Sequence, residues 1–111
     1  MAQIEHAEGV QNIDSILNVR GIDAIFIGPY DLSASMGLPG QVQHPEVIMA
    51  IRNVKNKCAD AAMPYGIFAS GPEPLRQEID DGCRYILCGV DSSLMSSSLR
   101  DLSDRLHKMI Q

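Results

Sequence analysis

The sequence has few basic residues, no long apolar run and no paired cysteine motif, and each absence excludes a class of protein. Lysine and arginine number 9 against 14 aspartates and glutamates, for a net charge of −5, so the basic surface of a nucleic-acid-binding protein is missing. The longest apolar runs, such as residues 24–27, are far too short to cross a bilayer. We therefore expect neither nucleic acid nor a membrane as a partner.

The cysteines show neither the pattern of a disulfide framework nor that of a metal site. Cys58, Cys83 and Cys88 are odd in number and lack the CxxC spacing that is typical of metal sites. Such usage is typical of reduced thiols. Polar side chains interrupt the first residues, so no secretory leader is expected. These features favour a cytoplasmic protein.

What is present is the composition of a globular chain. Hydrophobic residues make up 45% and charged residues 21% of 111 residues, which excludes a disordered or collagen-like protein. A chain of this length forms one domain at most, with a modest core. Residues 1–111 are therefore treated as one unit.

Short apolar runs alternate with longer amphipathic segments four times. The pattern predicts strands at residues 3–6, 23–27, 65–69 and 85–90, and helices at residues 8–19, 45–62, 73–81 and 93–110. Residues 29–45 are predicted to be a long connection. Near-continuous apolar strands between helices are typical of a parallel sheet covered by helices. The fold class is α/β, with four βα units, and both a doubly wound sheet and half of an eight-stranded barrel fit.

Two carboxylates lie at the carboxyl ends of the first two predicted strands. Glu5 lies at the end of the first strand and Asp31 follows the second, and functional groups collect at the carboxyl ends of parallel strands. Neighbouring strands lie about 4.8 Å apart, so the two side chains can converge on one small cation. Oxygen ligands suit magnesium or manganese. The alternative for Asp31 is a helix cap.

The turn after the second strand can bind an anion. Glycine at position 28 permits close backbone approach, and the amides of Tyr30 and Asp31 open a helix, where negative charge is favoured. A carboxylate such as that of pyruvate fits there. Glycine and proline also simply punctuate strand ends, so this alternative stays open.

Several runs of the sequence form a longer recognisable pattern. They are Gln3-Ile4-Glu5, then Gly28-Pro29-Tyr30-Asp31-Leu32-Ser33-Ala34-Ser35-Met36-Gly37, and then Gly40 and His44-Pro45. From about Gln3 to Val90 the chain resembles a known family, the HpcH/HpaI aldolases. This family includes the hydroxy-oxo-heptanedioate and 2-keto-3-deoxy-rhamnonate aldolases and is more distantly similar to citrate lyase beta subunits. The resemblance implies a TIM barrel of the phosphoenolpyruvate/pyruvate-domain type, with residues 1–111 corresponding to strands five to eight, the C-terminal half.

The resemblance also implies roles for individual residues. Glu5 and Asp31 would hold the divalent metal, which is magnesium or manganese, with cobalt as a further choice. Gly28 and the amides of Tyr30 and Asp31 would bind the carboxylate of the keto-acid substrate. Phe68 would line the substrate pocket.

The implied reaction is a class II retro-aldol cleavage of a 4-hydroxy-2-oxo acid to pyruvate and an aldehyde. The metal acts as a Lewis acid. The family's catalytic histidine and arginine belong to earlier strands, and His6, His44 and His107 do not match them. His44 is expected to be a loop or cap residue and His107 a solvated one. No catalytic residue is therefore assigned within this chain.

Other functions stay open beside the aldolase. One is a chain that binds metal and keto acid without turnover, and another is a carbon–carbon lyase of the citrate lyase beta type. A receiver-like or nucleotide-binding module is disfavoured, because His6-Ala7-Glu8-Gly9 is no phosphate loop. A half barrel exposes edge strands and an apolar sheet face. We therefore expect a homo-oligomer or a complementing N-terminal half.

Overall fold

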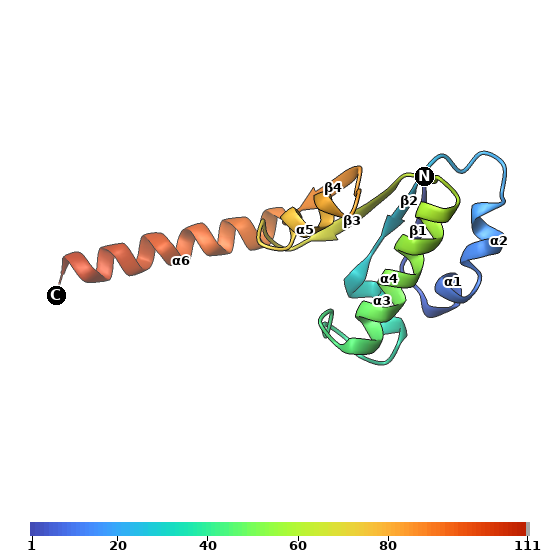
Figure 1. Ribbon diagram of the computed structural model, residues 1–111. Helices are drawn as coiled ribbons and strands as arrows, with labels where there is room; N and C mark the ends of the chain where they lie inside the picture. The colour runs from blue at the N-terminus through green and yellow to red at the C-terminus, as the bar shows by residue number, and fades with distance from the viewer. Residues whose placement is uncertain (111) are drawn as a thin grey trace.

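The computed structural model describes residues 1–110 and contains one parallel sheet of four strands (Figure 1). The strands are β1 (Ala2–Ile4), β2 (Ile25–Ile27), β3 (Tyr65–Ala69) and β4 (Tyr85–Cys88), in that spatial order. A helical segment connects each pair of consecutive strands. The prediction of an α/β fold with four βα units is confirmed.

The helices run close to their predicted ranges, with two exceptions. They are α1 (Ala7–Gln11), α2 (Ile13–Leu17), α3 (Pro29–Ser35), α4 (Pro45–Asp60), α5 (Leu75–Asp80) and α6 (Asp91–Met109). The single helix expected over residues 8–19 is broken at Asn12, whose backbone leaves the helical region at φ −98° and ψ 14°. The Asn12 side chain donates to the Glu8 carbonyl at 3.0 Å. An asparagine side chain that competes for backbone groups in this way disfavours a continuous helix.

The second exception is α3, which lies within the connection predicted for residues 29–45. Pro29 occupies the first turn, where its fixed φ and missing N–H suit a helix start. The buried Ser33 then closes the turn: its Oγ donates to the Tyr30 carbonyl at 2.6 Å and accepts from the Gly40 amide at 3.2 Å. These hydrogen bonds order a segment that carries no apolar periodicity, which is why the pattern missed it.

The two faces of the sheet differ in what covers them. One face, here called the outer face, carries Ile4, Ile27 and Ile67, which are 2%, 0% and 5% exposed. They pack in one core with Val54 and Cys58 of α4. Hydrophobic burial of this row is the main force that holds the helices on the sheet.

The other face, the inner face, has no helix over it among residues 1–110. Register aligns Gln3, Phe26, Gly66 and Tyr85 in one row across the four strands. Side chains alternate between faces along a strand, so this row points away from the helices. Tyr85 is 50% exposed. A sheet covered on one face only is the arrangement expected of part of a barrel wall.

Helix α6 projects away from the rest of the molecule (Figure 1). The long dimension of the molecule is 61 Å against 28 and 22 Å for the others, and every residue of α6 is exposed. Among residues 1–110, no helix is long and apolar enough to cross a membrane.

Candidate active site

The carboxyl ends of β1 and β2 meet at one edge of the sheet. The two strands pair in parallel, with Ile4 opposite Ile27. Directly beyond this pair, the Gly28 amide donates to the Ile4 carbonyl at 3.0 Å. Glu5 and the helix that carries Asp31 therefore start from adjacent positions, as the sequence predicted for neighbouring strands.

A serine of the motif fastens the two segments together. The Ser35 Oγ accepts a hydrogen bond from the Ala7 amide at 2.9 Å and donates to the Leu32 carbonyl at 2.7 Å. This contact joins the segment just after Glu5 to the last turn of α3. Because α3 also carries Asp31, Ser35 limits how far the two carboxylate-bearing segments can separate. Sequence reasoning had assigned Ser35 no role.

The side chain of Glu5 is held by a second residue that sequence reasoning did not single out. The Gln3 Nε2 donates to the Glu5 Oε2 at 2.7 Å. Residues two apart on a strand share a face, and that spacing is the signal that could have identified Gln3. The hydrogen bond orients the carboxylate without neutralising it.

Gly28 has no side chain, and the Glu5 and Gln3 side chains lie close to the position that a Cβ would occupy there. A Cβ at position 28 would lie 3.2 Å from the Glu5 Cβ, 3.7 Å from its Oε2 and 3.1 Å from the Gln3 Nε2. The backbone φ of Gly28 is −104°, which any residue adopts, so a larger residue here would meet no backbone strain but would have to displace the Glu5 and Gln3 side chains by a few tenths of an ångström. Gly28 is also the N-cap of α3 and provides no side chain that caps the helix.

The first turn of α3 therefore has amides available to a ligand. The first N–H groups of a helix have no partner within the helix. Pro29 has no N–H, so Tyr30 and Asp31 present the available donors at the site. These are the two amides that the sequence analysis assigned to a carboxylate.

A cavity of about 480 Å³ opens beside this turn, at the carboxyl end of the sheet. Gly28, Tyr30, Asp31 and Phe68, the four predicted substrate-binding residues, all line it. The rings of Tyr30 and Phe68 meet edge to face, with centroids 5.7 Å apart and planes at 72°, an arrangement that aromatic pairs favour. The rest of the lining consists of Gln3, Phe26, Pro29, Ser70, Leu87, Gly89, Val90 and Ser93.

No lysine, arginine or histidine is among the residues that line this cavity. His6 is the N-cap of α1, where its Nδ1 accepts from the Glu8 amide, and His44 caps α4 in the same way through the Glu46 amide. The expectation that His44 is a cap is confirmed. His107 is exposed on α6, where its Nδ1 lies 2.8 Å from the Ser103 carbonyl oxygen, which confirms that it is solvated.

The groups with perturbed pKa values lie elsewhere. Burial raises the pKa of the Cys58 thiol to about 11 and raises the pKa values of Tyr65 and Cys83 as well. All three belong to the core between the sheet and its helices, which is on the opposite side of the sheet from Phe26 and Phe68. They are structural groups. Because Cys83 and Cys88 flank and enter the fourth strand, the sequence predicts that both are buried thiols. Cys83 is buried, but the prediction is wrong for Cys88, which is exposed.

Two curated proteins are similar to this chain in sequence. Over 105 residues the chain is 41% identical to the hydroxypyruvate/pyruvate aldolase of Pseudomonas aeruginosa, and over 108 residues 34% identical to the 5-keto-4-deoxy-D-glucarate aldolase of Escherichia coli. These alignments cover 95% and 97% of this chain but 39% and 42% of the relatives. The chain thus spans about two fifths of the length of the curated relatives it matches.

A solved structure agrees with the sequence matches. The HpcH/HpaI aldolase of Desulfitobacterium hafniense superposes with a TM-score of 0.88 at 31% identity, over 96% of this chain and 41% of that one. Such structures have the TIM-barrel architecture. This confirms the expectation of a partial barrel and rules against the alternative, a doubly wound sheet. The family model described as HpcH/HpaI aldolase/citrate lyase matches residues 1–98. The chain belongs to the HpcH/HpaI aldolase/citrate lyase family.

Proposed function

We propose that this chain supplies the metal-binding and carboxylate-binding part of a class II aldolase site, which cleaves a 4-hydroxy-2-oxo acid to pyruvate and an aldehyde. The observation that carries the proposal is the cavity of about 480 Å³, lined by Gly28, Tyr30, Asp31 and Phe68 next to the Glu5 segment. The relatives named as aldolases support it.

Glu5 and Asp31 would hold the divalent ion. Their carboxylate oxygens suit magnesium or manganese, which keep several water or substrate ligands in addition to one or two carboxylates. Among residues 1–110, no cluster of three or more His, Cys, Asp or Glu side chains could hold a metal, so water and substrate would complete the coordination. The space left by Gly28 at the Glu5 Oε2 is consistent with this use. When bound, the ion supplies Lewis-acid polarisation of a keto oxygen.

The chain's own groups would bind and orient the keto acid. The Tyr30 and Asp31 amides would donate to its carboxylate at the positive end of α3. The Tyr30 and Phe68 rings form an apolar wall of the cavity, which excludes water from one side of the substrate and strengthens those hydrogen bonds. Binding and orientation are therefore the part of the reaction assigned to this chain.

The groups that move the proton would come from outside this cavity lining. Because no basic side chain lines the cavity, carbon–carbon cleavage needs a proton acceptor from water or from another chain segment. The same observation favours a second candidate function, in which residues 1–111 bind metal and keto acid without turnover.

We propose further that residues 1–111 form one partial-barrel domain of a cytoplasmic enzyme, completed by a second copy or by an N-terminal half. The uncovered inner face of the sheet supports this, since its row from Gln3 to Tyr85 has no helix over it. An apolar face of this kind needs a cover in water.

Titration calorimetry tests the binding site. Manganese, with oxalate as a pyruvate mimic, is titrated into wild type, Glu5→Gln and Asp31→Asn, and the two variants are expected to bind at least about tenfold more weakly. Glu8→Gln is the matched control, because Glu8 is an exposed carboxylate three residues from Glu5 and lies in α1. Equal affinity in all four proteins contradicts the metal assignment.

Turnover is measured separately, as pyruvate released from a 4-hydroxy-2-oxo acid. Metal binding with pyruvate release supports the aldolase. Metal binding without release, in the chain alone, supports the second candidate. Release that is unchanged in Asp31→Asn contradicts both.

A further inference from the structure

A second cavity, here called the α4–α5 cavity, lies between helices α4 and α5 at the carboxyl end of β3. Its volume is about 350 Å³, which is within the range of small-molecule sites. Pro29, Tyr30, Phe68 and Ser70 line both this cavity and the first one. The edge-to-face pair of Tyr30 and Phe68 is therefore part of the wall that separates the two cavities.

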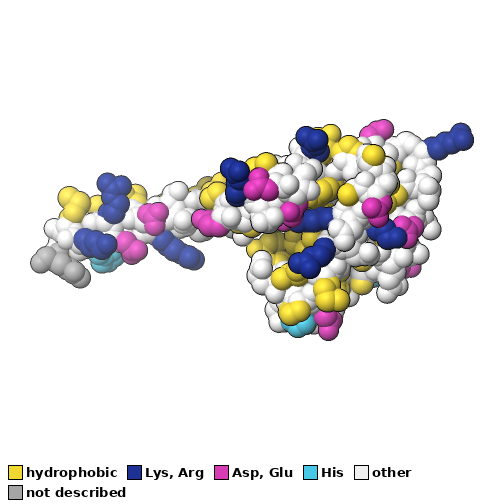
Figure 2. Space-filling model, viewed as in Figure 1, with side chains coloured by type: hydrophobic (Ala, Val, Ile, Leu, Met, Phe, Trp, Pro, Cys, Tyr) yellow, Lys and Arg dark blue, Asp and Glu magenta, His cyan; other side chains and the backbone are white. Residues whose placement is uncertain are grey.

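The floor of the α4–α5 cavity is apolar. Ile48 and Ile51 line it from α4, and the buried Ile67 lines it from β3. On α4, positions 48, 51, 52 and 55 share one face of the helix, so this face also brings Arg52 and Lys55 to the cavity. Figure 2 shows a hollow beside α4 with hydrophobic side chains inside it and lysine or arginine side chains at its edge.

The charge of Lys55 is already neutralised within the chain. Its Nζ lies 2.7 Å from the Glu78 Oε1 and 3.6 Å from the Asp81 Oδ2, and 5.9 Å from the centroid of the Tyr65 ring. Asp81 also accepts a hydrogen bond from the Gln77 Nε2 at 2.7 Å. Both acidic groups of the cavity therefore have donors, and Lys55 has little charge left for a ligand.

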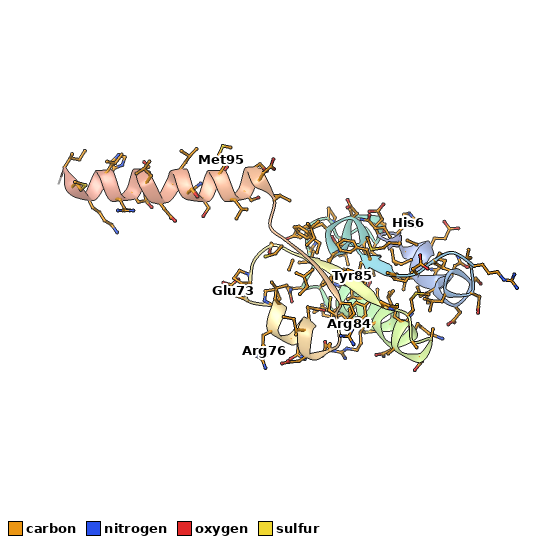
Figure 3. All side chains as sticks on the ribbon, turned by 90° about the horizontal axis from the view of Figure 1, so that it is seen from above. His6, Glu73, Arg76, Arg84, Tyr85 and Met95 are labelled. Atoms are coloured by element: carbon orange, nitrogen blue, oxygen red, sulfur yellow. The ribbon has the colours of Figure 1, made fainter. Side chains whose placement is uncertain are left out.

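Arg52, one turn before Lys55, is the basic group that is free to bind. It is exposed, and it forms no ion pair with any carboxylate among residues 1–110. Arg76 of α5 differs in both respects, because it pairs with Asp80 at 3.0 Å and points away from α4 (Figure 3). A guanidinium group presents a planar set of donors that matches the two oxygens of a carboxylate.

We propose that the α4–α5 cavity binds a small monocarboxylic acid with an apolar body. The carboxylate pairs with Arg52, and the body lies on Ile48, Ile51 and Ile67, where burial removes apolar surface from water. The free positive charge selects an acid over an amine. A second carboxylate on the ligand is disfavoured, because it would lie on the apolar floor or near Glu78 and Asp81.

This site is independent of the proposed chemistry. Glu5 and Asp31 are not among the residues that line the α4–α5 cavity, so its ligand requires no metal. Pyruvate has almost no apolar body and is expected to bind here poorly. The two cavities can therefore be tested separately on the same chain.

Titration of the wild-type chain with phenylacetate, in the presence of EDTA, tests the ligand class. Calorimetry is expected to show saturable binding with a Kd of about 1 mM or below, given the size of the probe. Phenylacetamide has the same shape without the charge, and it is expected to bind at least about tenfold more weakly. Absence of saturable phenylacetate binding up to about 10 mM, or equal affinity of the two probes, overturns the proposal.

Three variants locate the site. Arg52→Gln is expected to bind phenylacetate at least about tenfold more weakly than wild type. Arg20→Gln is the matched control, because Arg20 is also exposed, lines neither cavity and forms no ion pair among residues 1–110; it is expected to bind as wild type. Asp31→Asn is expected to bind phenylacetate as wild type, although it should lose manganese. Wild-type affinity in Arg52→Gln overturns the proposal, and so does loss of phenylacetate binding in Asp31→Asn.

Backbone amide shifts of the wild-type chain give a readout that needs no variant. Phenylacetate is expected to shift the amide resonances of Ile51, Ile67 and Gln77, which line only the α4–α5 cavity. Shifts confined to Leu87 and Gly89, which line only the first cavity, overturn the proposal. This map decides if Arg52→Gln does not fold. Failure of wild type to bind manganese would contradict the proposed function alone, since these titrations contain no metal.

Discussion

Replacing Gly66 by alanine is expected to weaken the sheet. A Cβ at this position would lie 2.5 Å from the Tyr85 carbonyl oxygen, 2.6 Å from the Tyr85 Cβ and 3.1 Å from the Phe26 Cδ2. Real Cβ atoms essentially never approach a backbone atom this closely. The added methyl group can be accommodated only if β3 and β4 move apart, because Gly66 pairs with Tyr85 in the register of these strands.

The magnitude follows from two opposing effects. Overpacking of this kind costs about 1–3 kcal/mol. Alanine leaves the unfolded chain less flexible than glycine does, and this stabilises the folded state by about 0.4–1 kcal/mol. The free energy of unfolding should therefore fall by about 1–2 kcal/mol, which for a domain near this size lowers Tm by roughly 5–15 °C.

Thermal denaturation followed by circular dichroism measures the change, with Gly9→Ala as the control. A Cβ at Gly9 would meet Ile4 side-chain carbons at 3.7 Å, an ordinary contact, and alanine is favoured in a helix by up to about 1 kcal/mol. Gly9→Ala should therefore match or exceed wild type. A Tm for Gly66→Ala equal to that of wild type refutes the reasoning, because the β3–β4 spacing would then tolerate the methyl group.

Three further predictions concern the site and the core. Gly28→Ala should weaken manganese binding by about tenfold, because the added Cβ would lie 3.2 Å from the Glu5 Cβ. Small displacements of residues that support a metal ligand have effects of this size. Calorimetry that shows an unchanged affinity contradicts the prediction. Ser35→Ala should lower the free energy of unfolding by about 1–2 kcal/mol, because the Ala7 amide loses the acceptor that lies 2.9 Å away. Urea titrations measure this change, and an unchanged midpoint argues against the contact. Burial raises the pKa of Cys58 from 9.0 to about 11, so the folded state retains a proton that the unfolded chain releases. That stabilisation is complete below about pH 9 and falls by about 2–3 kcal/mol as pH rises through 11; guanidinium titrations should show the decline, and Cys58→Ala should reduce it.

The edge of the sheet that carries the candidate site could be predicted largely from local sequence. Glu5 lies one residue after β1 and Asp31 four residues after β2, and parallel strands bring the segments that follow them to one edge. In the structure Gly28, Tyr30, Asp31 and Phe68 line one cavity, and their binding of a substrate remains a prediction. The pairing of Glu5 and Asp31 on a metal remains a prediction for the titrations above.

The contacts that hold this edge together were not predictable in the same way. Ser35 accepts from Ala7 across 28 positions of sequence, and no periodic pattern records a single long-range hydrogen bond. The extent of helix α3 was missed for a related reason. A helix start was expected at Tyr30 and Asp31, but the hydrogen bonds of Ser33 that close the helix leave no periodic pattern in the sequence.

The order of strands and helices, and the apolar side of each, follows from the sequence alone. Ile4, Ile27, Ile67 and Ile86 occupy equivalent places in their strands. Which of these apolar surfaces meet a partner is seen only in the folded chain, which buries the first three isoleucines and leaves Ile86 and the apolar side chains of α6 exposed. The physical reason is that hydrophobicity is non-directional: a periodic stripe requires burial, but the path of the chain at Gly89 and Val90 determines what is within reach to cover it.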